Sequence, residues 1–167
     1  MNLYILRHGI AVERDASSRG KDADRTLTPK GERRLWRITE AMAALELSFD
    51  LILSSPHLRA KQTAEIVAEA FRARKKPELL DSLTPESDPK TLIEHLHGLQ
   101  PAPESVLLVG HEPYLSGLIS RLVSGNVGLA VELKKGGLCR LTTESLKCGR
   151  CATLEWLLTP KQMELME

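Results

Sequence analysis

Two apolar runs of the sequence each end in a histidine, and the first run is also followed by an arginine. Arg7, His8 and Gly9 come after the run LYIL, and His111 comes after SVLLVG. A second arginine, Arg59, lies between them in the stretch SSPHLRAKQT. A guanidinium group matches the geometry of phosphate oxygens and keeps its charge at any working pH, and a neutral imidazole can attack phosphorus. Together these residues indicate phosphoryl transfer, with arginines supplying the positive charge that other enzymes take from magnesium.

This chemistry requires the four side chains to meet, and the hydrophobic pattern predicts elements that would bring them together. Apolar runs that alternate with helical periodicity indicate an α/β fold with a mostly parallel central sheet and an antiparallel edge strand. Helix starts are predicted where a capping residue or a proline opens a periodic stretch, at Thr28–Pro29, Ser55–Pro56 and Pro113. The expected strands cover residues 2–7, 50–54, 78–83 and 105–110, with a hairpin of 129–144 and 152–158; a further helix is expected at 91–99 and an exposed loop at 12–27.

The carboxyl ends of parallel strands are the place where ligands bind in such a sheet. His8 and His111 would both leave the sheet at that edge, and Arg59 would lie in the first turn of a helix whose N-terminus favours anions. If protonated, His111 could stabilise charge on the phosphoryl oxygens. Taken singly, each residue could instead be an ordinary histidine at a strand end or a solvated arginine. The sequence has no D-x-D cluster that would hold a metal ion, so we expect no metal and no cofactor.

Length and composition are those of an ordinary globular protein. The chain has 167 residues, 42% of them hydrophobic and 27% charged, so we expect a single domain over residues 1–167. The formal net charge of +1 predicts no general attraction to nucleic acid or to an anionic membrane. No apolar stretch approaches the ~20 residues of a membrane span, and the N-terminus lacks the pattern of a signal peptide. We therefore expect a cytoplasmic monomer.

The three cysteines are Cys139, Cys148 and Cys151. An odd number of cysteines argues against a disulfide framework. Cys148 and Cys151 form a C-x-x-C pair, but a structural zinc site needs four ligands and only Cys139 lies nearby. We expect a turn between two strands at the C-x-x-C pair, with a zinc site as the alternative.

Four blocks of the sequence resemble the histidine phosphatase (phosphoglycerate mutase-like) superfamily. Residues 6–9, LRHG, are similar to its R-H-G signature, and residues 27–31, LTPKG, to its L-T-x-x-G helix start. Residues 54–63 are similar to its S-P-x-x-R-A-x-Q-T block, and residues 110–113, GHEP, to the motif of its second histidine. The blocks occur in the family's order over almost the whole chain, and the stretch SLTPESD at 82–88 resembles the small SixA-type branch, the phosphohistidine phosphatases. The resemblance implies a three-layer α/β/α sandwich of the phosphoglycerate mutase-like kind.

The resemblance also implies a role for each matching residue. His8 would be the nucleophile that carries the phosphoryl group transiently, while Arg7 and Arg59 would bind the phosphoryl oxygens. His111 would complete the pocket and stabilise the transition state. Two further residues would contact the phosphate or the substrate: Gly9 and Arg25.

One departure from the family concerns the acid that protonates the leaving group. Relatives of the SixA type often have a glutamate just before the LTP stretch, where this chain has Ser82. Asp81 and Glu86 flank that position and are the remaining candidates for an acid. A missing acid hinders the release of an alkoxide but not of an imidazole, which can carry its own proton, so Ser82 favours a substrate with a P–N bond. The segment 72–104 is too short to build a lid, and we expect an open cleft that admits a histidine of another protein.

We therefore expect a metal-independent phosphatase that removes the phosphoryl group from histidine of a signalling or phosphotransfer protein. A phosphatase of small phosphate esters or anhydrides is one alternative. Outside the enzymes, the alternative is a module that binds phosphohistidine without turnover. His57 is expected at the rim of the site, and Glu112 is expected to cap or orient rather than to act as an acid.

Overall fold

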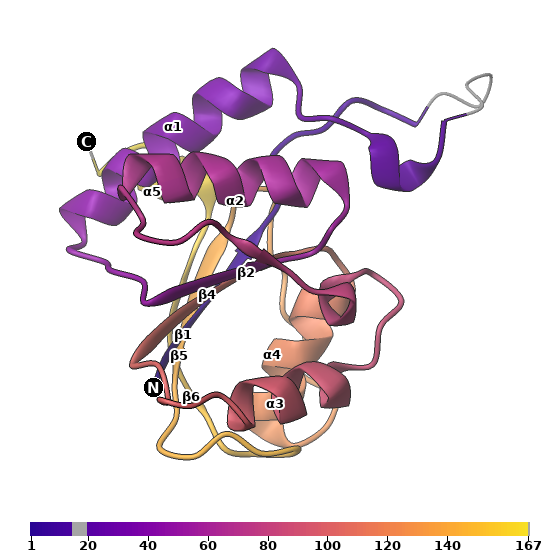
Figure 1. Cartoon of the computed structure of the whole chain (residues 1–167), viewed down its shortest axis with the longest axis vertical. Helices are drawn as coiled ribbons and strands as arrows, with labels where there is room; N and C mark the ends of the chain where they lie inside the picture. The colour runs from indigo at the N-terminus through magenta and orange to yellow at the C-terminus, as the bar shows by residue number, and fades with distance from the viewer. Residues whose placement is uncertain (15–19, 167) are drawn as a thin grey trace.

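The computed structural model describes residues 1–14 and 20–166 and has a six-stranded sheet between two layers of helices (Figure 1). The order across the sheet is β3-β2-β4-β1-β5-β6. The first four strands of the chain pair in parallel, and β5 pairs antiparallel with both β1 and β6. The predicted α/β fold with a mostly parallel sheet is confirmed, and the antiparallel pairing lies on the side of the edge strand β6. The strands are β1 (Asn2–Arg7), β2 (Leu51–Ser54), β3 (Glu78–Leu79), β4 (Ser105–Gly110), β5 (Leu138–Thr142) and β6 (Thr153–Leu158).

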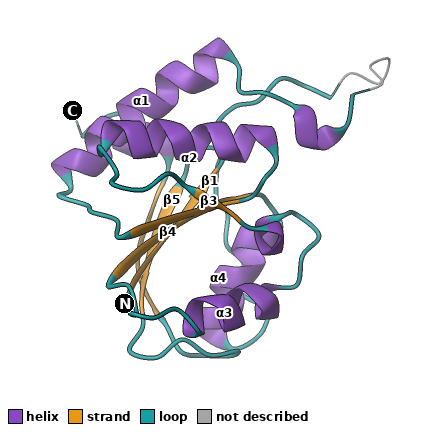
Figure 2. Cartoon of the chain, in the orientation of Figure 1, coloured by secondary structure: helices purple, strands orange, loops and turns teal. Residues whose placement is uncertain are grey.

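Helices cover both faces of the sheet and form a separate core with each (Figure 2). One face carries α1 (Pro29–Ala44), α2 (Leu58–Ala70) and α5 (Pro160–Met163), and the other carries α3 (Pro89–His97) and α4 (Tyr114–Ser124). Strand β4 is buried along its whole length. Its Leu107 belongs to the core with α1 and α2, and its Leu108 to the core with α3 and α4. Side chains alternate across a strand, so a strand covered on both faces must be apolar throughout, as SVLLVG is.

The helix starts agree with the predicted caps at α1 and differ at α2. The Thr28 hydroxyl accepts a hydrogen bond at 2.9 Å from the amide three residues on, and Pro29 opens the helix as predicted. The predicted start of α2 at Ser55–Pro56 is wrong, because the helix begins at Leu58. Ser55 lies just beyond β2 and is fully buried, and its hydroxyl contacts both the amide of His57, the residue before α2, and the ring of His111.

The remaining differences lie in the loops and near the C-terminus. The strand expected at 78–83 is divided into β3 and a short 3-10 helix, η2 (Asp81–Leu83). The loop expected at 12–27 contains another short 3-10 helix, η1 (Asp22–Asp24), and its residues 15–19 lie outside the described residues. The strand expected over 129–144 is shortened to β5, and α5 was not predicted. Such short elements have too few residues to show a periodic pattern, so packing decides them.

The described residues contain neither a candidate membrane span nor a candidate metal-ligand cluster. No helix within 1–14 and 20–166 is long and apolar enough to cross a membrane. In the same residues, no group of three or more His, Cys, Asp or Glu side chains is arranged to hold a metal ion. The thiols of all three cysteines are free, with Cys139 buried in β5, Cys148 exposed and Cys151 half-buried. The C-x-x-C pair lies in the turn between β5 and β6, as the sequence predicted.

Candidate active site

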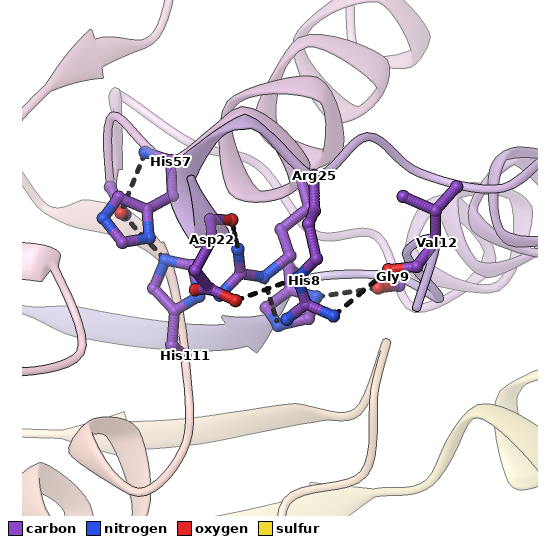
Figure 3. Close-up of polar contacts among 9 residues, drawn as sticks. His8, Gly9, Val12, Asp22, Arg25, His57 and His111 are labelled. Atoms are coloured by element: carbon purple, nitrogen blue, oxygen red, sulfur yellow. Dashed lines mark hydrogen bonds and ion pairs between the residues drawn. The ribbon is translucent and has the colours of Figure 1, made fainter. Parts of the chain in front are cut away.

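His8 and His111 meet at the carboxyl end of the sheet because β1 and β4 are neighbours. The parallel register pairs Arg7 with Gly110, so the next residue of each strand leaves the sheet beside the other. The His8 amide donates to the Gly110 carbonyl at 3.1 Å. The two imidazole rings are both buried, with 5.1 Å between their centroids (Figure 3). The predicted meeting of the two histidines therefore occurs.

The two ring nitrogens of His8 have different partners. Nδ1 lies 2.7 Å from the Gly9 carbonyl oxygen, which can only accept a hydrogen bond, so Nδ1 carries the proton. Nε2 then presents its lone pair, to which Arg59 Nε donates at 3.2 Å. A backbone carbonyl thus sets the tautomer of His8 and leaves Nε2, next to a guanidinium, as the atom that can attack an electrophile.

His8 is uncharged in the folded protein. Its side chain is only 5% exposed, and burial lowers its pKa to about 3, assisted by the nearby charges of Arg59, Arg7 and Lys135. The neutral imidazole is the nucleophilic form. Folding therefore holds His8 at neutral pH in the form that phosphoryl transfer requires.

Arg59 reaches His8 from the first turn of α2, and the same helix supports the chain around His8. Thr63, one turn further along, donates to the Arg59 carbonyl at 2.7 Å. Its hydroxyl accepts from the Gly9 amide at 3.1 Å. This hydrogen bond links the segment after β1 to helix α2. Gly9 was predicted to contact substrate, but its amide already donates to the Thr63 hydroxyl.

His111 is held by Ser55, which the sequence assigned to a helix cap. His111 Nε2 lies 2.8 Å from the Ser55 hydroxyl. That hydroxyl already accepts from the His57 amide at 3.2 Å, so its proton is available to His111 Nε2. When the hydroxyl donates to Nε2, His111 carries its own proton on Nδ1, which is buried and has no hydrogen-bond partner in the described part of the chain. A buried donor in this position is suited to the oxygen of a bound anion.

The electrostatic surroundings of His111 also favour a neutral ring. Burial lowers its pKa to about 2, and the neighbouring histidines and Arg59 act in the same direction. The protonated His111 that the sequence allowed is not the form that the fold favours. His57 is half-buried, and its ring centroid lies 5.0 Å from that of His111, so it borders the site.

Arg7 approaches the same pocket from the end of β1. Its Nη1 donates to the Leu133 carbonyl at 3.0 Å, while its Nε is buried without a hydrogen-bond partner among the described residues. Its charge contributes to the lowered pKa of His8 and of Arg59, so it lies near both. Burial lowers the pKa of Arg7 itself and the charge of Glu112 raises it, but a guanidinium stays charged in a protein. His8 is therefore surrounded by donors from three different strands and helices.

Asp22 is a residue of this site that the sequence analysis missed. Its carboxylate forms ion pairs with Arg25 Nε at 2.9 Å and with Arg59 Nη2 at 3.1 Å, and its backbone carbonyl accepts from Arg59 Nη1 at 2.9 Å (Figure 3). Burial acts to raise the pKa of Asp22, but the two guanidinium groups outweigh it and lower the pKa below its ordinary value. The sequence signal of Asp22 is weak because it stands in a polar, aperiodic loop.

Arg25, predicted to contact phosphate or substrate, borders the site through Asp22. Its Nη1 donates to the Val12 carbonyl at 3.1 Å, and its Nε forms the ion pair with Asp22. Arg25 therefore fastens the loop around η1 to the chain that follows β1 and adds positive charge at the mouth of the site.

The two predicted acids make none of these contacts, although the charge of Glu86 acts to raise the pKa of His57. Asp81 and Glu86 are exposed. In the described part of the chain, no hydrogen bond or ion pair joins either carboxylate to Arg59 or His8. Asp81 instead contributes its backbone carbonyl, which accepts from two nearby hydroxyls. Glu112 caps α4 through a hydrogen bond from the Ser116 amide at 3.0 Å, as predicted.

Known proteins share both the sequence and the fold. The histidine phosphatase superfamily (branch 1) matches residues 3–84. The chain is 39% identical over 142 residues to an uncharacterized protein of Picosynechococcus, with 84% of each chain covered. It is 34% identical over 128 residues to the phosphohistidine phosphatase SixA of Escherichia coli, covering 75% of this chain and 76% of the relative. A solved structure of the protein histidine phosphatase SixA complexed with tungstate is similar with a TM-score of 0.83 and 25% identity, over 96% of this chain and 98% of that one.

Proposed function

The chain belongs to the histidine phosphatase superfamily, and we propose that this phosphatase removes the phosphoryl group from a histidine of a signalling or phosphotransfer protein. One observation carries the proposal: His8 is buried and neutral, its Nδ1 proton is held by the Gly9 carbonyl, and its Nε2 faces Arg59. A site that only binds phosphate has no need of a nucleophile prepared in this way. The relatives named SixA support the same class of substrate.

In the first half of the proposed reaction, His8 Nε2 attacks the phosphorus atom of the substrate. Arg59 Nε, which donates to Nε2 in the resting site, would move its hydrogen bond to a phosphoryl oxygen. Arg7 Nε and His111 Nδ1 are buried donors without partners in the described chain, and both would bind the remaining oxygens. Phosphoryl transfer depends mainly on such positioning and charge stabilisation.

In the second half, water attacks the phosphorus atom carried by His8. The P–N bond breaks, its electron pair returns to Nε2, and inorganic phosphate leaves. Throughout, His8 Nδ1 keeps its proton and donates a hydrogen bond to the Gly9 carbonyl, so the resting tautomer is restored without rearrangement. The arginines provide the positive charge for both halves, which supports a reaction that proceeds without a metal ion.

The surroundings of the site support a protein substrate. Between α2 and β4 the chain forms only β3, η2 and α3, and α3 contributes its apolar residues to the core on the far face of the sheet. These elements leave little chain to form a lid over the site. A phosphohistidine that projects from a phosphotransfer or phosphocarrier domain is the partner that we propose.

Replacing His8 tests the proposed function directly. We expect His8→Ala to lower the turnover of a phosphorylated phosphotransfer domain by at least about 10³-fold, because no other group replaces the nucleophile. The wild-type protein incubated with a phosphodonor should carry acid-labile phosphate on His8. EDTA should leave the rate unchanged.

His95→Ala is the matched control, because His95 is an exposed histidine on α3. It should retain wild-type turnover. Full activity of His8→Ala would contradict the covalent mechanism, and tight binding of the phosphorylated domain without any turnover by the wild type would favour the binding module instead. Loss of activity in EDTA would contradict the metal-independent step.

A further inference from the structure

Asp22 lies on the opposite side of the Arg59 guanidinium from His8. Arg59 donates from Nε to His8 Nε2 at 3.2 Å, and from Nη1 and Nη2 to the carbonyl and the carboxylate of Asp22 at 2.9 and 3.1 Å. The Arg59 side chain is 4% exposed, whereas that of Asp22 is 35% exposed. One guanidinium therefore separates the nucleophile on the inside from a carboxylate at the mouth of the site (Figure 3).

The carboxylate of Asp22 is ionised and has no proton to give. Its ion pairs with Arg59 and Arg25 lower its pKa in spite of its partial burial. Each carboxylate oxygen has more than one site for a hydrogen bond, so Oδ1 and Oδ2 can accept a further N–H while they remain paired with the arginines. Asp22 can therefore hold an N–H group, but it cannot protonate an alkoxide.

The leaving group of the proposed reaction would depart toward the more exposed side of the site, where Asp22 lies. In-line displacement places the leaving group on the far side of phosphorus from the nucleophile, and His8 Nε2 attacks from the buried side. Burial lowers the pKa of His111 and the charge of Asp22 opposes that lowering, so the field of Asp22 reaches that ring. The other candidate carboxylates, Asp81 and Glu86, have no bond to Arg59 in the described chain.

We propose that Asp22 selects phosphohistidine over phosphate esters by accepting a hydrogen bond from the leaving imidazole, an inference that rests on the proposed function. Protonated phosphohistidine has an N–H on the ring nitrogen that is not phosphorylated. The lone pair of His8 Nε2 forms the new N–P bond, and the substrate's P–N bond breaks with its electron pair going to the substrate nitrogen. The substrate imidazole leaves neutral and keeps the N–H that Asp22 holds. No proton is transferred, so the step needs no acid.

The Asp22 carboxylate would disfavour the leaving group of a phosphate ester. Its leaving oxygen has no N–H to donate, and negative charge develops on it beside the negative charge of Asp22. The same carboxylate therefore helps the release of an imidazole and hinders the release of an oxygen. A selection of this kind is a difference between two reactions, so its measure is the ratio of their rates.

The experiment compares the wild type with Asp22→Asn on N-phosphoimidazole and on p-nitrophenyl phosphate, whose leaving group departs without an acid. We expect kcat/KM on the P–N substrate to fall about tenfold in the variant, as for the loss of one charge-assisted hydrogen bond, while the value on the ester stays the same or rises. The ratio of the two values is the readout, because a smaller folded fraction or a weaker hold on Arg59 affects both substrates alike.

Glu65→Gln is the matched control, since Glu65 is an exposed carboxylate of α2 whose ion pair is with Lys61 rather than with a residue of the site. It should keep both wild-type values. The ratio is kcat/KM on N-phosphoimidazole divided by kcat/KM on p-nitrophenyl phosphate. If this ratio is unchanged or larger in Asp22→Asn, Asp22 does not select between the substrates and only orients Arg59. This holds whether both activities fall together or neither falls. A wild-type protein that cleaves no P–N substrate would instead overturn the proposed function.

Discussion

At the residue scale, His8 and His111 illustrate how folding prepares ordinary side chains for chemistry. The usual pKa of a histidine is 6.5, and burial lowers it to about 3 for His8 and about 2 for His111. The Gly9 carbonyl contacts Nδ1 of His8, and the Ser55 hydroxyl contacts Nε2 of His111. Both rings are neutral in the folded chain and differ in their hydrogen-bond partners, although the two residues have the same chemistry in an unfolded chain.

These two histidines should make the protein less stable as the pH falls below 6.5. The unfolded chain binds a proton at each histidine near that pH, whereas the folded chain does so only near pH 3 or below, so protonation favours unfolding. We expect each histidine to reduce the free energy of unfolding by about 1.5 kcal/mol between pH 6.5 and pH 5. Urea unfolding at several pH values measures this change.

His111→Gln removes its own contribution, so the pH dependence in that interval should become less steep, while the contributions of His8 and of His57, whose pKa burial also lowers, remain. His95→Gln should keep the wild-type dependence, because His95 is exposed. Equal slopes for the wild type and His111→Gln would show that the fold does not hold His111 in its neutral form.

At the element scale, α1 packs against the segment that follows β1 at a point where only glycine fits. A Cβ atom on Gly31 would lie 2.2 Å from the carbonyl oxygen of Ile10. The same carbonyl accepts a hydrogen bond from the Thr28 amide at 2.9 Å. Ile10 comes directly after Gly9, whose carbonyl orients His8. The start of α1 therefore holds the backbone that sets the tautomer of His8.

Gly31→Ala should destabilise the protein by about 3 kcal/mol, because neither backbone can move without loss of the α1 contact. The activity of the folded fraction should fall as well, since the chain at Gly9 would shift. Gly117→Ala is the matched control in α4, where a Cβ atom meets nothing within 4 Å. It should stabilise the protein by about 0.5–1 kcal/mol as alanine replaces glycine within a helix. The denaturant midpoints of both variants measure these changes in stability. Similar midpoints for the two variants would contradict the close approach of Gly31 to the Ile10 carbonyl.

At the scale of the whole molecule, β1 links the site to both cores. It pairs with β4 on one side and β5 on the other, and residues 3–6 are buried. Ile5, in the middle of β1, pairs with Cys139 of β5. Cys139 has no exposed surface, and burial raises the pKa of its thiol to about 12. The thiol can react only when the sheet opens.

The three thiols should therefore react with a thiol reagent in two distinct phases. Cys148 is exposed and Cys151 half-buried, so both should react in the native protein. Cys139 should react at least about 100-fold more slowly, at a rate set by opening of the core. Cys139→Ala should lack the slow phase, and Gly31→Ala should accelerate it. Three thiols reacting at one rate would contradict the burial of β5 within a stable sheet.

Much of the architecture could be predicted because it depends on neighbours in sequence. The apolar run SVLLVG indicated a strand buried on both faces, and Thr28 with Pro29 marked the start of α1, as found. Ser55 followed the same local rule and was placed wrongly, because its hydroxyl is engaged by His111, 56 residues away. The short α5 was missed although it has a local start signal, the Thr159–Gln162 capping box with Pro160, because its four residues are too few to show helical periodicity.

The sequence by itself determined the chemical groups of the site and the strand ends that carry Arg7, His8 and His111. Only the tertiary structure decided how those groups are paired and charged. Asp22 and Arg59 are 37 residues apart and bonded, and the pKa values of both histidines follow from burial among segments distant in the chain. The physical reason is range: side-chain alternation and helix caps act between near neighbours, whereas desolvation and hydrogen-bond partners depend on which elements pack together.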